Sequence, residues 1–219
     1  MKFRIQSPDR PGMTRPLLLL GALLLAACAG SPPPAAPAPA AAPSGPSCAA
    51  ALARAGFVFE PAPDRDGPGD CRLRDAVRLS RSHVALDQPL LVSCPTAEHL
   101  LRFEADVVQP AAQRHFGQRL ARIRHFGGYA CRLRNGDTRA IRSEHALGQA
   151  IDIAGFDLAD GTQITVARHW GEFGPRGAFL RQVAREACSI FHIVLTPRTD
   201  ALHRSHLHLD IGRWRRCDA

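Results

Sequence analysis

The sequence lacks several features that would place a chain in a common class. Its seven cysteines include no Cys-x-x-Cys pair, and none adjoins the histidine-rich segments, so the usual cysteine zinc motifs are excluded. The longest apolar run, residues 17–27, is too short for an ordinary membrane-spanning helix. No internal repeat is present, and the single lysine among 28 basic residues reflects composition rather than a binding code.

The N-terminal segment predicts export. Basic residues open the chain, the apolar run follows, and Leu25-Ala26-Ala27-Cys28 places small residues before a cysteine. This pattern resembles the bacterial lipoprotein signal, in which Cys28 is lipidated and becomes the mature N-terminus. A plain secretory signal is the alternative. We expect residues 1–27 to be a signal peptide and the mature lipoprotein to face the periplasm, anchored in the outer membrane.

A tether and one domain are expected after the signal. Residues 28–47 are almost entirely Ala, Pro, Ser and Gly, a composition that cannot bury a core. Extended at about 3.1 Å per residue, they would span on the order of 50–60 Å, which suits an enzyme acting on a polymer away from its membrane. An ordinary low-complexity linker is the alternative. Residues 48–219 are long enough for one monomeric domain with a genuine core.

The charge of the chain is mildly basic. The formal value is +8, and residues 1–27 carry four basic and one acidic side chain, which leaves 24 basic against 19 acidic residues, or +5. This balance favours approach to anionic wall polymers or lipid surfaces, and nucleic acid is a poor partner for an exported chain.

Six cysteines remain after Cys28. An even set in an exported chain predicts three disulfides in an oxidising compartment. Fifteen pairings of six cysteines exist. We chose Cys48–Cys71, Cys131–Cys188 and Cys94–Cys217.

The hydrophobic pattern predicts an α+β fold, with a small antiparallel sheet and helices packed on one of its sides. Helices are expected at residues 49–55, 97–116 and 178–191, the second capped by Thr96 and bent or broken at Pro110. Strands are expected at residues 75–79, 90–93, 120–126, 129–133, 150–154, 193–195 and 207–211.

Two segments carry the chemistry. Residues 143–152 read Ser-Glu-His-Ala-Leu-Gly-Gln-Ala-Ile-Asp, and residues 206–210 read His-Leu-His-Leu-Asp. A hydrolytic zinc needs three nitrogen or oxygen ligands and a fourth position for water. His145 and Asp152 would come from the first segment, with Gly148 supplying a bend between them. One histidine of the second segment would complete the set.

The alternation of the two segments predicts which side chains share a face. Asp152 lies in an Ala-Ile-Asp-Ile-Ala run, so its carboxylate shares a face with two alanines that leave room for an ion. His206, His208 and Asp210 share a face of the other strand, with the two imidazoles about 6.6 Å apart. One can therefore bind zinc while the other faces the reacting group. Scattered surface or core histidines are the alternative.

With these residues in hand, the chain resembles the bacterial extensin-like C-terminal domain family from Cys48 to Gly212. The matching segments are Gly128-Tyr129-Ala130-Cys131-Arg132, Ser143-Glu144-His145 through Asp152-Ile153, Ala187-Cys188-Ser189-Ile190-Phe191, and His203-Arg204-Ser205-His206-Leu207-His208-Leu209-Asp210.

That family in turn resembles zinc peptidases of the lysostaphin and D-Ala-D-Ala carboxypeptidase superfamily, which cleave peptide bonds in peptidoglycan. The resemblance implies one zinc ion bound by His145, Asp152 and His208. The carboxypeptidase branch has a Glu three residues before the last ligand, and this chain has Ser205 there. His206 is the substitute that the resemblance offers for proton transfer, as in the branch with His-x-His.

Other residues have two interpretations each. Asp210 would orient an imidazole from behind the ligands or cap a strand end. Arg132 would bind a substrate carboxylate or lie on the surface, and His203 would face the substrate or begin the strand. Glu144 would point away from the site if its segment is extended.

Three functions follow from these residues. The first is a zinc-dependent peptidoglycan endopeptidase or carboxypeptidase, and the second is a wall-binding lipoprotein that keeps the zinc fold without turnover. The third is a structural spacer between outer membrane and wall, with incidental histidines.

Overall fold

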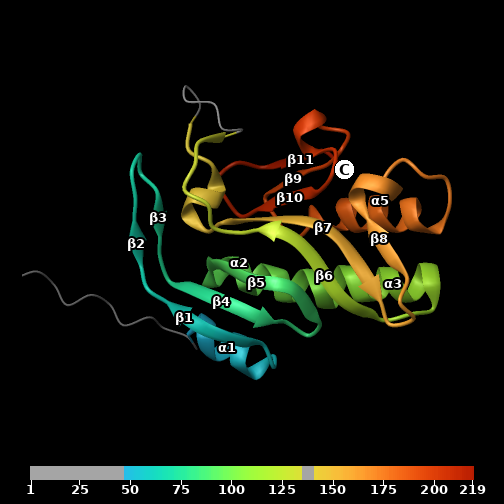
Figure 1. The fold of residues 1–219 in the computed structure, drawn as a ribbon, viewed down its shortest axis with the longest axis horizontal. Coiled ribbons are helices and arrows are strands. Elements are labelled where there is room, and N and C mark those ends of the chain that lie inside the picture. Colours follow the sequence, from blue (N-terminus) through green and yellow to red (C-terminus); the bar gives the residue numbers. More distant parts are fainter. Residues whose placement is uncertain (1–46, 135–140) are drawn as a thin grey trace, which may run out of the picture. The chain divides into compact units, whose positions relative to one another are not determined.

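A computed structural model describes residues 47–134 and 141–219, which form an α+β fold (Figure 1). The predicted signal peptide, the lipidation site Cys28 and nearly all of the tether lie outside the described residues. The strands are β1 (Val58–Ala62), β2 (Arg65–Asp66), β3 (Arg72–Leu73), β4 (Ala76–Arg81), β5 (Ala85–Ser93), β6 (Leu120–Gly127), β7 (Ala150–Leu158), β8 (Gln163–Thr165), β9 (Ile193–Leu195), β10 (Leu207–Asp210) and β11 (Arg216–Cys217).

The main sheet is large and mixed, whereas a small antiparallel sheet was expected. Its nine strands follow the order β1-β4-β5-β6-β7-β10-β9-β11, with β8 paired to β7, and β2 and β3 form a separate pair. The pairs β5–β6 and β9–β11 are parallel. The expectation failed at β5–β6 because a long helical crossover joins these strands, and such a crossover returns the chain in the same direction.

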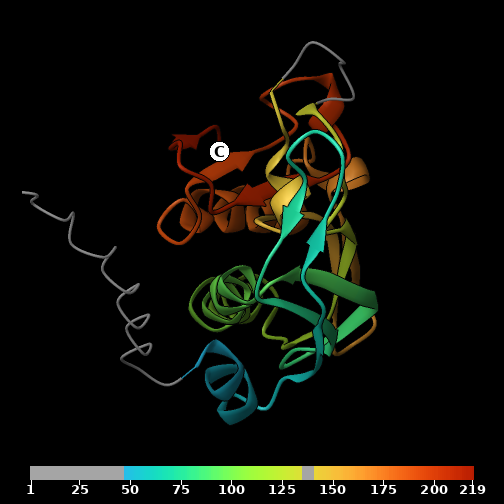
Figure 2. The same cartoon turned by 90° about the vertical axis from the view of Figure 1, so that its left-hand side faces the viewer.

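The helices pack on one side of the sheet, as expected (Figure 2). None of them, within residues 47–134 and 141–219, combines the length and the apolar character that crossing a membrane requires. The α-helices are α1 (Cys48–Arg54), α2 (Cys94–Arg102), α3 (Gln109–Phe116), α4 (Val166–His169) and α5 (Pro175–Ala187); η1 (Phe103–Val108) is a π-helix, and η3 (Glu144–Leu147) and η4 (Ala201–His203) are 3₁₀ helices.

The crossover differs from the helix expected at residues 97–116. It begins earlier, at Cys94, so Thr96 is not a cap, and its hydroxyl instead donates to the Gly148 carbonyl at 2.8 Å. Pro110 does not break it, because the helical run continues through η1 into α3. In an α-helix a proline ring clashes with the backbone carbonyl of the preceding turn. The wider π-helical turn just before Pro110 leaves room for the ring.

Two other elements are shorter than expected. The helix predicted at 178–191 is α5, which begins at Pro175, a favoured first-turn residue, and ends at Ala187. Its apolar residues Phe179, Val183 and Ala187 are buried in the core. The strand predicted at 129–133 is reduced to one isolated bridge between Leu133 and Arg142.

The part of the chain that the structure describes holds three disulfides, but all three pairings differ from those expected. The observed bonds are Cys48–Cys94, Cys71–Cys131 and Cys188–Cys217. The first joins the starts of α1 and α2, the second ties the β2–β3 hairpin to the segment after β6, and the third links the end of α5 to β11. These partners meet only through the folding of the whole sheet, which cysteine spacing does not encode.

Candidate metal centre

The candidate metal centre is built on two neighbouring strands, β7 and β10. Asp152 and His208 are direct antiparallel partners, so their side chains leave the same face of the sheet. The pairs on either side of them, Leu207 with Ile153 and Leu209 with Ile151, have buried side chains that belong to the core. The side chains of Asp152 and His208 therefore lie on the face of the sheet away from the helices.

His145 reaches the same point from η3. Its backbone N–H donates to the Ser143 hydroxyl, which caps the 3₁₀ turn, and Gly148 ends the turn with φ of 67°. A side chain is strained in that backbone region, so the bend expected at Gly148 is confirmed and requires glycine. The short turn brings His145 back over β7, seven residues before Asp152.

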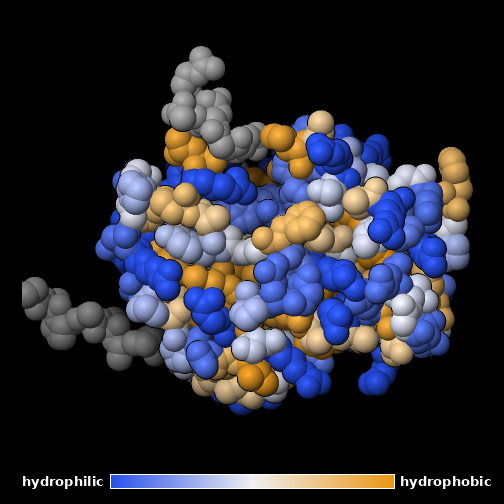
Figure 3. Space-filling view, in the orientation of Figure 1, coloured by the Kyte–Doolittle hydropathy of each residue, from blue (hydrophilic) through white to orange (hydrophobic). Residues whose placement is uncertain are grey.

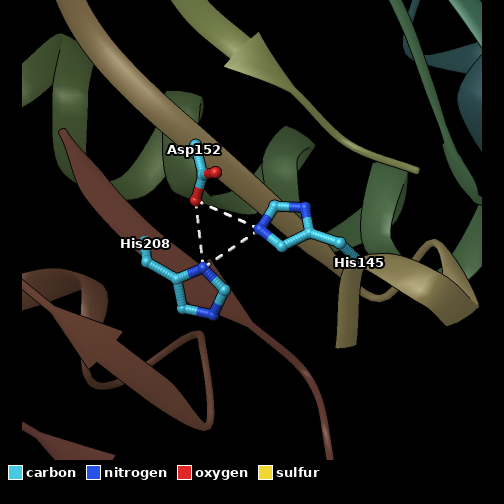
Figure 4. A group of neighbouring side chains, drawn as sticks. All are labelled: His145, Asp152 and His208. Carbon is cyan, nitrogen blue, oxygen red and sulfur yellow. Dashed lines mark hydrogen bonds and ion pairs between the residues drawn. The ribbon is translucent and has the colours of Figure 1, made fainter. Parts of the chain in front are cut away.

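Three ligand-type atoms converge here (Figure 4). His145 Nε2 lies 3.2 Å from Asp152 Oδ1 and 3.2 Å from His208 Nδ1, and the last two atoms are 3.0 Å apart. Among the described residues, these three form a group that could hold a metal ion. The spacing fits ligands at about 2.0–2.2 Å from one shared ion.

The outer nitrogens of both imidazoles are fixed by hydrogen bonds. His145 Nδ1–H donates to the Gly128 carbonyl at 2.6 Å, and His208 Nε2–H donates to Asp210 Oδ2 at 3.0 Å. These bonds leave His145 Nε2 and His208 Nδ1 facing Asp152. Such outer partners orient metal-binding histidines in proteins, so the role expected for Asp210 has its geometry here.

The electrostatics of the cluster favour a cation between the three side chains. Burial opposes the charged form of Asp152, but hydrogen bonds from His145 and His208 outweigh it and hold the pKa of this carboxyl well below its usual range. Burial also opposes a charged His208, yet its bonds to Asp152 and Asp210 raise its pKa to about 9. In the metal-free protein a proton on His208 thus supplies the positive charge, and metal binding would release it.

His206 lies beside the three. β10 begins only at Leu207, so His206 immediately precedes the strand, and its side chain lines the same cavity as His208 and Asp210. Its Nε2 is 3.6 Å from Asp152 Oδ1, and its buried Nδ1 has no hydrogen-bond partner among the described residues. Burial lowers the pKa of His206, which keeps its imidazole neutral near pH 7.

A cavity of about 210 Å³ opens over the cluster. Four residues singled out from the sequence contribute to its wall beside the metal-site pair Asp152 and His208. They are Arg132, His203, His206 and Asp210. Sequence reasoning missed further wall residues, namely Arg134, Glu144, Thr199, Asp200 and Arg216.

Glu144 requires a correction. An extended segment would point its side chain away from the site, but the segment is the 3₁₀ turn η3. The tighter turn brings the Glu144 carboxylate to the cavity wall, 3.9 Å from Arg134 Nη2. Burial and the charge of Asp210 raise the pKa of Glu144.

The sequence alone did not indicate that Gly128 orients His145. The Gly128 carbonyl orients His145, and the backbone passes so close to β5 that an added Cβ would meet Val92 and the Leu91 carbonyl. The signal in the sequence was the Gly127-Gly128 pair at the end of β6, since paired glycines indicate a close approach of two backbones.

Residues 46–218 match the model of a family described as extensin-like protein C-terminus. The chain belongs to this family. No curated protein and no solved structure matches the chain.

Proposed function

We propose that the protein is a zinc-dependent hydrolase that cleaves peptide bonds in bacterial peptidoglycan, exported and tethered by a lipid on Cys28. The observation that carries the proposal is the convergence of His145, Asp152 and His208 at one point of an open cavity. The residue types, two imidazoles and one carboxylate, are those of hydrolytic zinc sites. The similarity of the extensin-like pattern to the lysostaphin and D-Ala-D-Ala carboxypeptidase superfamily supplies the substrate class.

The residues present fit a zinc ion. Two imidazoles of fixed tautomer and a carboxylate of lowered pKa offer three donor atoms, and the cavity leaves room for water. Bound there, zinc would act as a Lewis acid that polarises the scissile carbonyl and makes water more acidic.

His206 would act as the general base and general acid of the reaction. Its neutral imidazole, at the edge of the cluster, can accept a proton from the attacking water and donate it to the departing amine. His203 lies beside it, with ring centroids 5.2 Å apart, and donates from Nδ1 to Asp200 at 2.8 Å. This contact fixes the His203 ring at the cavity wall, where it would contact substrate.

The arginines of the cavity would bind the peptide. Arg132, Arg134 and Arg216 line the same space as the metal cluster. A guanidinium binds a carboxylate through two parallel hydrogen bonds, so a stem-peptide carboxylate near the cleaved bond would be held in one orientation.

A second candidate is a wall-binding lipoprotein that keeps the metal site without turnover. One observation favours it: Ser205 occupies the position where the carboxypeptidase branch has a Glu, three residues before His208. Both candidates share the metal site and differ in the chemistry of His206.

The deciding experiment uses protein reloaded with one equivalent of zinc and incubated with purified sacculi. Mass spectrometry of the released muropeptides should show loss of peptide cross-links or of terminal residues, and a His208→Ala variant should show neither. If zinc-loaded wild-type protein leaves sacculi and isolated muropeptides intact across neutral pH, the hydrolase proposal is wrong. The wall-binding lipoprotein then becomes the better explanation of the site.

A further inference from the structure

A second cavity adjoins the candidate metal centre, and Glu144 lies in the wall of both. Its volume is about 460 Å³. We name it the Trp214 cavity; its walls combine apolar and hydrogen-bonding side chains, among them Trp214, Ile141, Leu147, Asp70, Arg142 and Gln149. Because Glu144 borders both spaces, a polymer bound in the second cavity can extend toward the metal cluster in the first.

Exposed apolar side chains gather around these two cavities. Trp214 is 53% exposed and Ile141 59%, and both line the Trp214 cavity. Phe126 is 61% exposed, and its ring packs edge-on against His206, with centroids 5.7 Å apart. The face of the sheet away from the helices is turned to the viewer in Figure 3, where apolar patches interrupt a mainly hydrophilic surface. Large apolar side chains left in water beside a cavity indicate a binding surface.

Trp214 is held in place relative to the metal strand. Only Ile211, Gly212 and Arg213 separate it from Asp210, and the Gly212 N–H donates to Asp210 Oδ1 at 2.9 Å. The Gly212 carbonyl accepts from His192 at 2.6 Å. The Arg213 guanidinium lies 4.7 Å from the centroid of the indole, a cation–π contact. The backbone just before Trp214 is therefore fixed to the candidate metal centre, and one face of the indole packs against Arg213.

We propose that the Trp214 cavity binds an N-acetylated hexosamine of the wall glycan. A pyranose ring has an apolar C–H face that stacks on the negative face of an indole, and a rim of hydroxyl groups that bond to amide, carboxylate and guanidinium side chains. Trp214 provides the platform, while Gln149, Asp70 and Arg142 provide the bonding groups. Ile141 and Leu147 supply apolar wall for the acetyl methyl group.

This assignment divides the substrate between the two cavities. The metal cavity carries three arginines and the histidines, which suit a charged peptide. The Trp214 cavity combines an indole with planar polar groups, which suits a sugar. The inference rests on the proposed function for its polymer, since a peptidoglycan substrate carries sugar and peptide on one chain. It adds the subsite that would place the glycan strand.

The test measures sugar binding without hydrolysis. The metal-free protein is titrated with N-acetylglucosamine hexamer, with peptide-free glycan strands and with free stem peptide, and followed by calorimetry and indole fluorescence. The wild type should bind both glycans, and Trp214→Ala should weaken that binding at least about tenfold. Phe173→Ala is the matched control: Phe173 is a fully exposed aromatic that lines neither cavity, so its loss should leave binding unchanged.

The outcomes separate this inference from the proposed function. Glycan binding that depends on Trp214, in a protein that cleaves no muropeptide with zinc, overturns the hydrolase and leaves the sugar subsite standing. Cleavage with zinc, combined with glycan binding that is absent or unchanged in Trp214→Ala, overturns the subsite and leaves the hydrolase. Trp214-dependent binding of stem peptide alone also overturns the subsite, because the cavity then receives the peptide.

Discussion

Two carboxylates on opposite sides of the sheet, the partly buried Asp152 and the fully buried Glu104, differ in what surrounds them. Asp152, on the open side, has imidazoles within hydrogen-bonding distance, and its pKa lies well below the usual range. Glu104, in the π-helical turn of the helical layer, is fully buried, and neither of its oxygens has a hydrogen-bond partner among the described residues. Burial raises the pKa of Glu104 to about 7, and the nearby Ser82 hydroxyl and His83 backbone offset only part of this rise.

The difference shows that burial alone does not make a functional carboxylate. A buried charge is stable only where partners replace the lost water, so Asp152 stays ionised and available to a cation while Glu104 gives up its charge near neutral pH. The side of the sheet that faces the cavity therefore holds the candidate metal cluster, and the helical side forms the hydrophobic core. Substitutions on the two sides should separate these contributions.

The largest expected effect comes from removing a partner of Asp152. His208→Ala takes away one imidazole of the cluster and leaves two ligand residues, so we expect loss of both bound zinc and detectable cleavage of wall peptides. Metal analysis after gel filtration and muropeptide assays check this. His99→Ala, a histidine on α2 that lines neither described cavity around the site, is the matched control and should keep both properties. A His208→Ala protein with stoichiometric zinc would contradict the ligand assignment.

The second effect concerns His206, which touches the cluster without completing it. His206→Ala should keep zinc bound, because the three ligand side chains remain, yet lower peptide cleavage about 10²–10⁴-fold. Zinc content and turnover measured on the same preparation separate the two properties. Full turnover in the variant would place proton transfer elsewhere, and Glu144 would be the next residue to substitute, since its carboxylate also reaches the cavity.

The sequence predicted the site better than its surroundings. Strict alternation in Ala150–Ala154 and around His208 placed Asp152 and His208 on one face, because a two-residue period has only one interpretation when the isoleucines and leucines must be buried. The bend at Gly148 was recognisable for a similar reason. The direction of Glu144 was not, because a single 3₁₀ turn reverses it and no periodic pattern marks so short an element.

Longer-range features were beyond local patterns. The cysteine pairs, the parallel β5–β6 pairing and the meeting of Trp214 with η3 all depend on how distant segments pack. The hydrogen bond from His145 to the Gly128 carbonyl also depends on packing, because 17 residues separate the two. The hydrophobic pattern still predicted the α+β class, because that class follows from the types of element along the chain. The even cysteine count after Cys28 predicted the number of disulfides.

The third effect tests the packing side of the same strand. Ile153 neighbours Asp152 but faces the core, where its side chain is fully buried. Ile153→Ala should lower the free energy of unfolding by about 2–5 kcal/mol through lost burial and a new cavity. Below the unfolding transition the variant should still bind one zinc ion. Urea unfolding and metal titration check the two expectations, and loss of metal binding in folded variant protein would show that the two faces are coupled.

The smallest effect comes from Glu104 and depends on pH. Its folded pKa of about 7 lies above the ordinary value of 4.5, so the folded protein holds the proton more tightly than the unfolded chain does. This acid therefore contributes no penalty below about pH 4.5, and stability falls as pH rises from there through 7, by about 3 kcal/mol at most. Glu104→Gln removes the charge, and the cost of burying its amide is the same at both pH values. Relative to the wild type, we therefore expect the variant to gain about 3 kcal/mol at pH 8 compared with its effect at pH 4.5.

Urea unfolding of both proteins at the two pH values measures that difference. His83 must be considered in the same experiment, because its Nδ1 lies 3.5 Å from Glu104 Oε2 and a protonated imidazole there would favour the ionised carboxyl. Repeating the comparison in a His83→Ala background removes this contact. A Glu104→Gln effect that is identical at both pH values, with and without His83, would show that Glu104 remains ionised in the fold. Polar groups other than those described would then stabilise the Glu104 carboxylate, and its pKa would no longer contrast with that of Asp152.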